Sequence, residues 1–108
     1  RRLAKLRDEM KAACRANDSS AFLRAARGAI RERVGSLVNH DRPDALARDE
    51  VLDILRKNEI AGETLSEVRD VLETVDAREF AGDDNGNLPL KEWLGRVNRL
   101  LKRIPDRA

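Results

Sequence analysis

Hydrophobic residues recur at intervals of three and four along most of the chain, and this spacing places them on one face of an α-helix. Leu3, Leu6 and Met10 begin the first of these stripes, and Trp93 and Val97 belong to the last. Polar segments interrupt the pattern four times. We therefore predict five helices, at about residues 2–16, 19–38, 44–58, 64–77 and 89–104.

Residues that favour helix starts and stops mark the ends of these segments. Asp18 and the two serines after it supply capping side chains for the second helix. Pro43 disfavours helix in the residue before it and suits the first turn of the third helix. Thr64 and Glu67 have the T-x-x-E spacing of a capping box, so we place the start of the fourth helix at Thr64. Pro105 ends the fifth.

The composition supports an all-α fold, a compact bundle of about five helices in a single domain spanning residues 1–108. Ala, Glu, Lys, Leu and Arg account for 59 of the 108 residues, and there are only three aromatic residues. No run of strongly apolar residues exceeds three, so the sequence predicts neither a membrane span nor a signal peptide. Because the chain opens on Arg1 and Arg2 without a methionine, we expect a fragment of a longer protein.

Charge is distributed unevenly along the chain. Residues 1–33 carry ten Lys or Arg against four Asp or Glu, residues 34–90 carry six against fourteen, and residues 91–108 carry six against two. Such a pattern can fold into a surface whose charges compensate one another, which is the more frequent outcome. It can also present a basic terminus to an anionic partner such as a membrane face.

The segment AGDDNGNLPLKEW, residues 81–93, resembles a calcium-binding loop in part. With Gly86 at the obligatory glycine position, three other ligand positions match: Asp83, Asn85 and Glu92. The first ligand position, which normally supplies a carboxylate, is Ala81. We therefore interpret the segment as a polar turn that starts the last helix, and we expect no metal site.

Catalytic residues are not evident in the sequence. His40 is the only histidine and lies in a polar link beside Asp41, with no nucleophile close to it in the sequence. Cys14 falls on the apolar stripe of the first helix, where a buried thiol is inert. We therefore expect no enzymatic activity, no cofactor and no small-molecule substrate.

The third and fourth helices, joined by a short link that contains Gly62, have the proportions of a helix-turn-helix unit. The would-be recognition helix carries four acidic residues against Arg69 alone, so its field repels phosphate. We expect no nucleic-acid binding. A degenerate EF-hand-like or helix-turn-helix module remains the alternative to an interaction domain.

Three segments together resemble the C-terminal cytosolic domain of BatD-like (oxygen tolerance, or aerotolerance) proteins: AFLRAARGAIRERVG (21–35), DEVLDILRKNEIAGETLSEVRDVLETVDAREFAG (49–82) and KEWLGRVNRLLKRI (91–104). Arg78 and Phe80 are the most characteristic matches. The chain departs from the family pattern at Glu79, which separates the arginine from the aromatic residue, and at Gly82, where the family commonly has proline.

The resemblance implies a cytosolic helical domain that follows a transmembrane helix, and thus a location on the cytoplasmic side of the inner membrane. It also implies a non-enzymatic interaction or scaffold role, with von Willebrand A-domain proteins or a MoxR-type AAA+ ATPase as partners. A basic start is expected just inside a membrane-spanning helix. We therefore expect a membrane-proximal basic patch formed by Arg1, Arg2, Lys5, Arg7 and Lys11.

Arg78 and Phe80 form the corner on which this resemblance depends most. Continuing the fourth helix brings Arg78 toward its apolar side, and we expect Phe80 to leave the helix and become buried against the last one. The guanidinium of Arg78 should then lie near backbone carbonyls at the helix end, where a cation is favoured. In this view both residues fasten the following loop, and the alternative is that they bind a partner.

Overall fold

The computed structural model describes residues 2–81 and 88–105, and this part of the chain is all-α, which confirms the predicted fold class. It contains five α-helices and one short 3-10 helix. Their bounds are α1 Arg2–Arg15, α2 Ser19–Leu37, η1 Pro43–Ala45, α3 Arg48–Lys57, α4 Gly62–Ala81 and α5 Leu90–Arg103. None of the helices in these two ranges is both long enough and apolar enough to cross a membrane.

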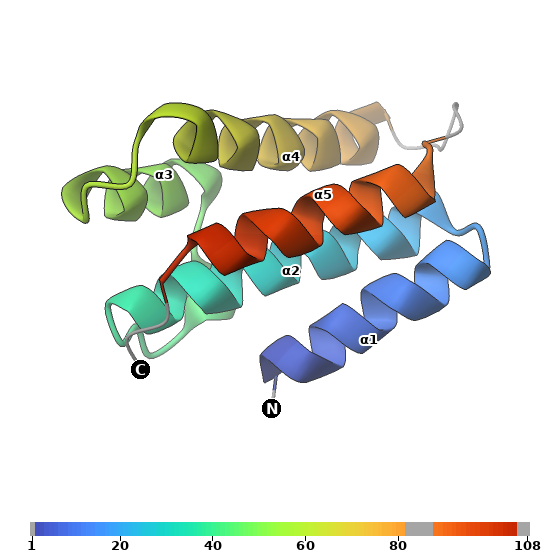
Figure 1. Cartoon of the computed structure of the whole chain (residues 1–108), viewed down its shortest axis with the longest axis horizontal. Coiled ribbons are helices and arrows are strands. Elements are labelled where there is room, and N and C mark those ends of the chain that lie inside the picture. The colour runs from blue at the N-terminus through green and yellow to red at the C-terminus, as the bar shows by residue number, and fades with distance from the viewer. Residues whose placement is uncertain (1, 82–87, 106–108) are drawn as a thin grey trace.

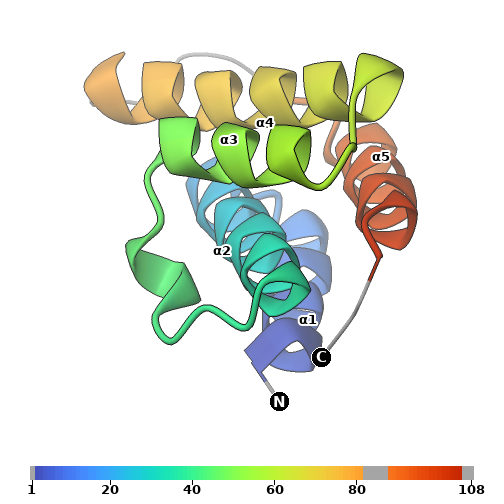
Figure 2. The ribbon, with the colours of Figure 1, turned by 90° about the vertical axis from the view of Figure 1, so that its left-hand side faces the viewer.

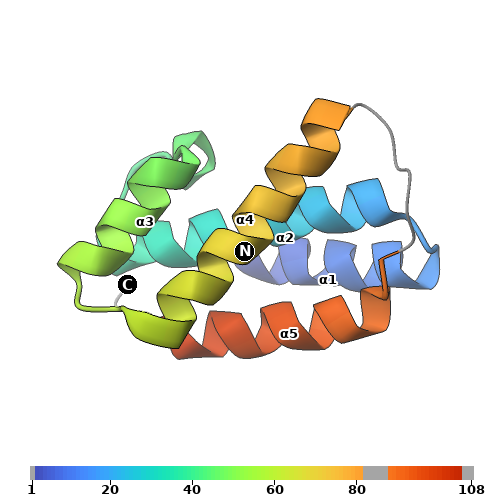
Figure 3. The same cartoon turned by 90° about the horizontal axis from the view of Figure 1, so that it is seen from above.

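The helices form three layers with α2 in the middle (Figures 1 and 2). α2 and α5 run side by side, and α1 packs against both of them on one side. α3 and α4 cover the opposite side, crossing α2 and α5 obliquely, as the view from above shows (Figure 3). α2 contacts every other element, whereas α1 contacts only α2 and α5. The arrangement therefore separates α1 from α4 across the whole thickness of the bundle.

One hydrophobic core joins the layers. Phe22, Ile30 and Val34 of α2 are fully buried, and the alanines between them leave room for neighbouring helices. Leu6 of α1 packs so closely on α2 that a Cβ added to Gly28 would lie 3.0 Å from one of its methyl carbons. Trp93 lies only partly buried against the core, so its removal should cost less than that of a fully buried ring.

The predicted cap of α2 is present. Asp18 has extended backbone angles, and its side chain accepts a hydrogen bond of 3.1 Å from the backbone N–H of Ala21. The α2 helix therefore starts at Ser19, as the capping segment indicates.

The third helix is shorter than predicted, because Leu46 interrupts it. The 3-10 helix Pro43–Ala45 ends at Leu46, whose backbone is extended and whose side chain is buried in the core. α3 begins after Ala47, and the backbone N–H of Ala47 donates to the Glu50 carboxylate at 2.8 Å. Burial of one leucine in an extended conformation thus replaces the first turn of the predicted helix.

The fourth helix extends beyond the predicted limits at both ends. It starts at Gly62, whose positive φ of 64° allows the chain to turn into the helix. The predicted capping box at Thr64 is therefore wrong, since Thr64 already lies within the first turn. Glu67, the other member of the proposed box, forms ion pairs with α5 instead.

Candidate interaction surfaces

The layers of the bundle carry opposite charge. α4 holds six Asp or Glu against two Arg, whereas α1 and α5 each hold five Lys or Arg, against two acidic residues in α1 and one in α5. α2 adds four Arg against one Glu. Since α1 and α4 lie on opposite sides of α2, the uneven charge along the chain becomes a basic side and an acidic side of the folded domain.

Where α5 meets α4, part of this charge is compensated. Glu67 of α4 accepts from Arg96 at 3.3 Å and from Arg103 at 3.2 Å, and Arg96 also lies 3.5 Å from Asp70. The guanidinium carbon of Arg96 is 5.1 Å from the centroid of the Trp93 ring, within cation–π range. These contacts fix the edge of α5 that faces α4.

A second set of ion pairs connects α2 and α3 to the C-terminal half of α4. Arg27 donates two hydrogen bonds to Glu79, at 2.7 and 2.8 Å, and lies 4.0 Å from Asp76. Arg48 of α3 donates to Asp76 at 3.0 Å. Arginine suits this position because its planar guanidinium matches both oxygens of a carboxylate.

The pairing with Arg27 gives a testable pH dependence. This pairing lowers the pKa of Glu79 below its ordinary 4.5. The stabilisation is therefore complete above pH 4.5 and is lost as the pH falls through the lowered pKa, because protonation removes the carboxylate charge. We expect the loss of stability caused by Glu79→Gln in urea unfolding to be present at pH 7 and to disappear under acidic conditions.

Glu73→Gln is the matched control, since Glu73 is exposed on the same helix and forms no ion pair among the described residues. It should show no such pH-dependent difference. A Glu79→Gln effect of equal size at pH 7 and pH 3 would show that the charge of Glu79 contributes nothing to stability.

Phe80 contradicts our expectation of burial against the last helix, because 95% of its surface is exposed. The chain does not leave the helix at this point, since α4 continues to Ala81. An α-helix turns roughly 100° per residue, so Phe80 lies about 140° around the helix from the buried Val75, five residues earlier. Arg78, closer to the inward side, is partly buried and takes part in interactions within the fold.

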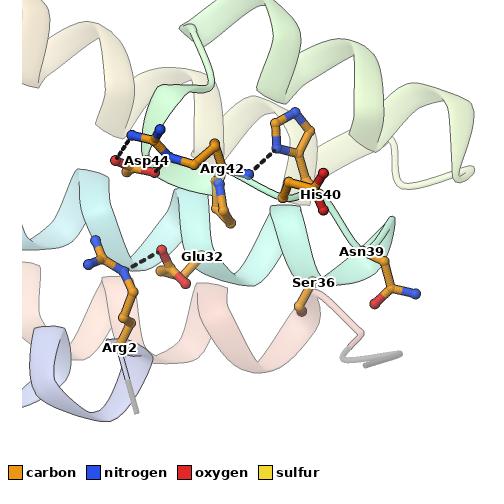
Figure 4. Close-up of a pocket in the computed structure, with 9 residues that line it drawn as sticks. Arg2, Glu32, Ser36, Asn39, His40, Arg42 and Asp44 are labelled. Carbon is orange, nitrogen blue, oxygen red and sulfur yellow. Dashed lines mark hydrogen bonds and ion pairs between the residues drawn. The ribbon is translucent and has the colours of Figure 1, made fainter.

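His40 lines an open depression of about 580 Å³ between the start of α1, the end of α2 and η1 (Figure 4). Two ion pairs lie in its walls: Arg2 with Glu32 at 2.8 Å, and Arg42 with Asp44 at 3.1 Å. The Arg42 guanidinium holds the pKa of Asp44 below its ordinary value.

The polar groups beside His40 are likewise engaged with the backbone. The Nδ1 atom of His40 accepts the backbone N–H of Arg42 at 3.0 Å, and the hydroxyl of Ser36 donates to the Arg33 carbonyl at 2.9 Å. The Nδ1 atom and the hydroxyl are therefore each engaged with the backbone. Cys14, the other candidate, is partly buried on α1 rather than fully buried.

The segment around Gly86, predicted to be a polar turn without a metal site, includes residues 82–87, which lie outside the described part of the chain. Glu92, the last matching position, is exposed on α5. Within residues 2–81 and 88–105, no group of three or more His, Cys, Asp or Glu side chains could hold a metal ion.

The helix-turn-helix candidate corresponds to α3 and α4, which lie together in one layer (Figure 2). Its second helix is the acidic α4, four of whose carboxylates pair with arginines of the fold: Glu67, Asp70, Asp76 and Glu79. No cation-rich recognition surface is formed by this pair of helices.

The predicted basic patch is only partly formed from free cations. Arg1 lies outside the described residues, and Arg2 pairs with Glu32 of α2. Lys5, Arg7 and Lys11 form no ion pair within the described ranges. Sequence reasoning missed the basic residues of α5 that extend this surface, Lys91 and Lys102. Their separation of eleven residues, close to three helical turns, was the available signal.

Comparison of the chain with protein-family models, with curated proteins and with solved structures finds no match.

Proposed function

We propose that this chain is a non-enzymatic protein-interaction or scaffold domain that docks a partner through the outward side of α4. The observation that supports this proposal is the almost complete exposure of Phe80, 95%, at the end of an acidic helix. A phenylalanine that contributes no burial to its own fold is free to bury its ring in another protein. Aromatic residues of this kind are frequent anchors of protein interfaces.

The residues around Phe80 define what such a partner must offer. Glu73, Ala77 and Phe80 follow one another at intervals of four and three, and all three are exposed on α4. The small side chain of Ala77 leaves the Phe80 ring accessible to a partner. Glu73 adds a carboxylate one helical turn before Ala77. The complementary surface is an apolar pocket with Lys or Arg on its rim.

The resemblance to BatD-like proteins suggests the setting and the partners. In this proposal the domain lies on the cytoplasmic side of the inner membrane, as part of a membrane protein. A von Willebrand A-domain protein or a MoxR-type AAA+ ATPase binds the α4 surface, and no chemistry takes place on the domain itself.

The test is capture of these two proteins, taken from the same organism, by the immobilised chain. Phe80→Ala should weaken capture at least 10-fold while the far-ultraviolet circular dichroism spectrum and the unfolding midpoint stay unchanged, because the ring is a binding anchor and not part of the core. Val38→Ala is the matched control, since Val38 is the other exposed large hydrophobic residue of the described chain, at 43%. It should leave capture intact.

Equal capture by the wild type and Phe80→Ala would contradict the proposal, as would a failure of the wild type to retain either protein.

A further inference from the structure

Two groups of cations on this fold differ in whether they form ion pairs. Arginines at the helix seams, such as Arg27, Arg48 and Arg96, are held in ion pairs with α4. A second group on α1 and α5 has no ion pair among the described residues, and five of its members form what we call the basic face: Arg7, Lys11, Arg15, Lys91 and Lys102. Lys5 lies instead on the side of α1 that faces α2, four residues before Glu9, and Arg99 is exposed on the outer side of α5. The fold does not use the charge of this second group.

The residues of α1 that face α2 show on which side of the helix these cations lie. Glu9, Ala13 and Ala16 line a depression shared with α2, so that edge of α1 faces α2. Arg7, Lys11 and Arg15 are one turn apart on the opposite and outer part of the helix, nearer to α5, the other helix that α1 contacts.

On α5, the ion pairs fix the orientation in the same way. Arg96 and Arg103 point to α4, so the opposite edge of the helix is turned toward α1. That edge carries Lys91 and Lys102, both exposed. The cations of the basic face therefore border the seam between α1 and α5, and these two helices lie on the side of the bundle away from α4 (Figure 2).

This placement is unfavourable for the isolated domain. Like charges spaced by four residues on a helix repel each other by a few tenths of a kcal/mol per pair, and Arg7, Lys11 and Arg15 form two such pairs. The exposed Asp8, three residues before Lys11, offsets one of them. The acidic layer cannot relieve them, because the bundle measures 35 × 26 × 24 Å and charges are screened beyond about 10 Å at 0.1 M salt. An anionic surface outside the domain would relieve this repulsion.

We propose that the basic face lies on a membrane surface containing anionic lipids, which leaves the acidic α4 side directed into the cytosol. This inference rests on the membrane location in the proposed function, and it assigns the docking residues and the orientation of the domain. The cations are spread along two neighbouring helices and do not converge on a pocket, which suits the diffuse charge of headgroups.

Nucleic acid fits this face less well. Sequence readers insert a protruding element into a groove, and proteins that bind single strands stack bases on aromatic rings. Here α1 packs against both α2 and α5 and does not protrude from the bundle (Figure 2). The described aromatic residues are placed elsewhere: Phe22 is in the core, Trp93 lies under Arg96, and Phe80 is on α4.

The experiment is sedimentation of the 108-residue chain with phosphatidylcholine vesicles that contain either no phosphatidylserine or 30% phosphatidylserine, at 0.1 M and 0.5 M salt. Binding is expected only to the anionic vesicles and only at the lower salt concentration. Two double variants remove two charges each from the face, Arg7→Gln with Lys11→Gln on α1 and Lys91→Gln with Lys102→Gln on α5. Each should weaken binding about 30-fold, since a cation near such a surface contributes about 1 kcal/mol.

Lys57→Gln with Arg69→Gln is the control of equal charge change, located on α3 and α4, and it should alter binding less than 3-fold. Absence of binding to anionic vesicles at 0.1 M salt would overturn the inference, as would an equal loss in the control variant. A mixed-sequence DNA duplex that binds more tightly than the vesicles, with the same dependence on the two face variants, would also overturn it.

Vesicle sedimentation uses no protein partner, and the capture assay with Phe80→Ala uses no lipid. A negative result in vesicle sedimentation therefore does not affect the conclusion from the capture assay, and a negative capture assay does not affect the conclusion from sedimentation.

Discussion

Phe22→Ala is expected to lower the free energy of unfolding by about 3–5 kcal/mol, because removal of a fully buried aromatic ring leaves a cavity. Phe22 has no exposed surface and is the largest of the fully buried side chains in the described chain. It lies on α2, the helix that contacts every other element, so its cavity opens where the layers meet. Urea unfolding followed by circular dichroism measures this loss directly.

Phe80→Ala is the matched comparison, since it removes the same ring from an exposed position. It should change the free energy of unfolding by less than about 0.5 kcal/mol. A loss of several kcal/mol for Phe80→Ala would mean that the ring packs on the bundle, and the binding role proposed for it would lose its basis. A loss below about 1 kcal/mol for Phe22→Ala would show that α2 is not the centre of the core.

Gly35→Ala should be destabilising by about 1–2 kcal/mol, although alanine is the better helix former. A Cβ atom at this buried position would lie 2.7 Å from Cβ and 2.8 Å from Cγ of Pro43. The ring of Pro43 is rigid, so relief of the clash requires the 3-10 helix to move away from the end of α2. Thermal unfolding of the two proteins side by side is sufficient to detect this effect.

Gly95→Ala should change stability in the opposite direction, so it tests whether the clash with Pro43 causes the loss expected for Gly35→Ala. Its added Cβ would contact only the end of the Arg99 side chain, at 3.3 Å, which can move aside. The substitution should stabilise the domain by about 0.5–1 kcal/mol through helix propensity alone. Stabilisation by Gly35→Ala as well would show that Pro43 does not close over the end of α2.

The helices were predictable because their apolar stripes are continuous and their ends carry strong local signals. Asp18 is such a signal, and α2 begins immediately after it, at Ser19. The errors arose where a tertiary contact overrode the local pattern. Leu46 reaches the core from extended backbone and shortens α3. Glu67, which matches a capping box, is held by two arginines that lie 29 and 36 residues further along the chain.

The candidate surfaces were less predictable than the fold. Burial of Phe80 was inferred on the expectation that the chain leaves the helix before this residue. α4 instead continues four residues beyond its predicted end, to Ala81, and this turns the ring to solvent. The sequence does not show which cations form ion pairs, since Arg2 and Lys5 are both basic residues at the start of the same helix. Only packing shows that Arg2 meets Glu32 while Lys5 meets no carboxylate among the described residues.

In the proposed account, the separation of charge lets one small domain bind a protein and a membrane at the same time. Seam arginines neutralise four carboxylates of α4 and leave Glu73 and the Phe80 ring facing outward. The lysines and arginines of the basic face point away from that side. Under this account, a protein partner and an anionic membrane approach opposite sides of the bundle without competing.

Amide hydrogen exchange of the chain, alone and with the captured von Willebrand A-domain or MoxR-type protein, tests the central claim most directly. The account predicts slowed exchange at the C-terminal half of α4, around Ala77 and Phe80, with α1 unchanged. Slowed exchange confined to α1 and α5, or no change in α4 on saturation with the partner, would contradict the assignment of the α4 surface to protein docking.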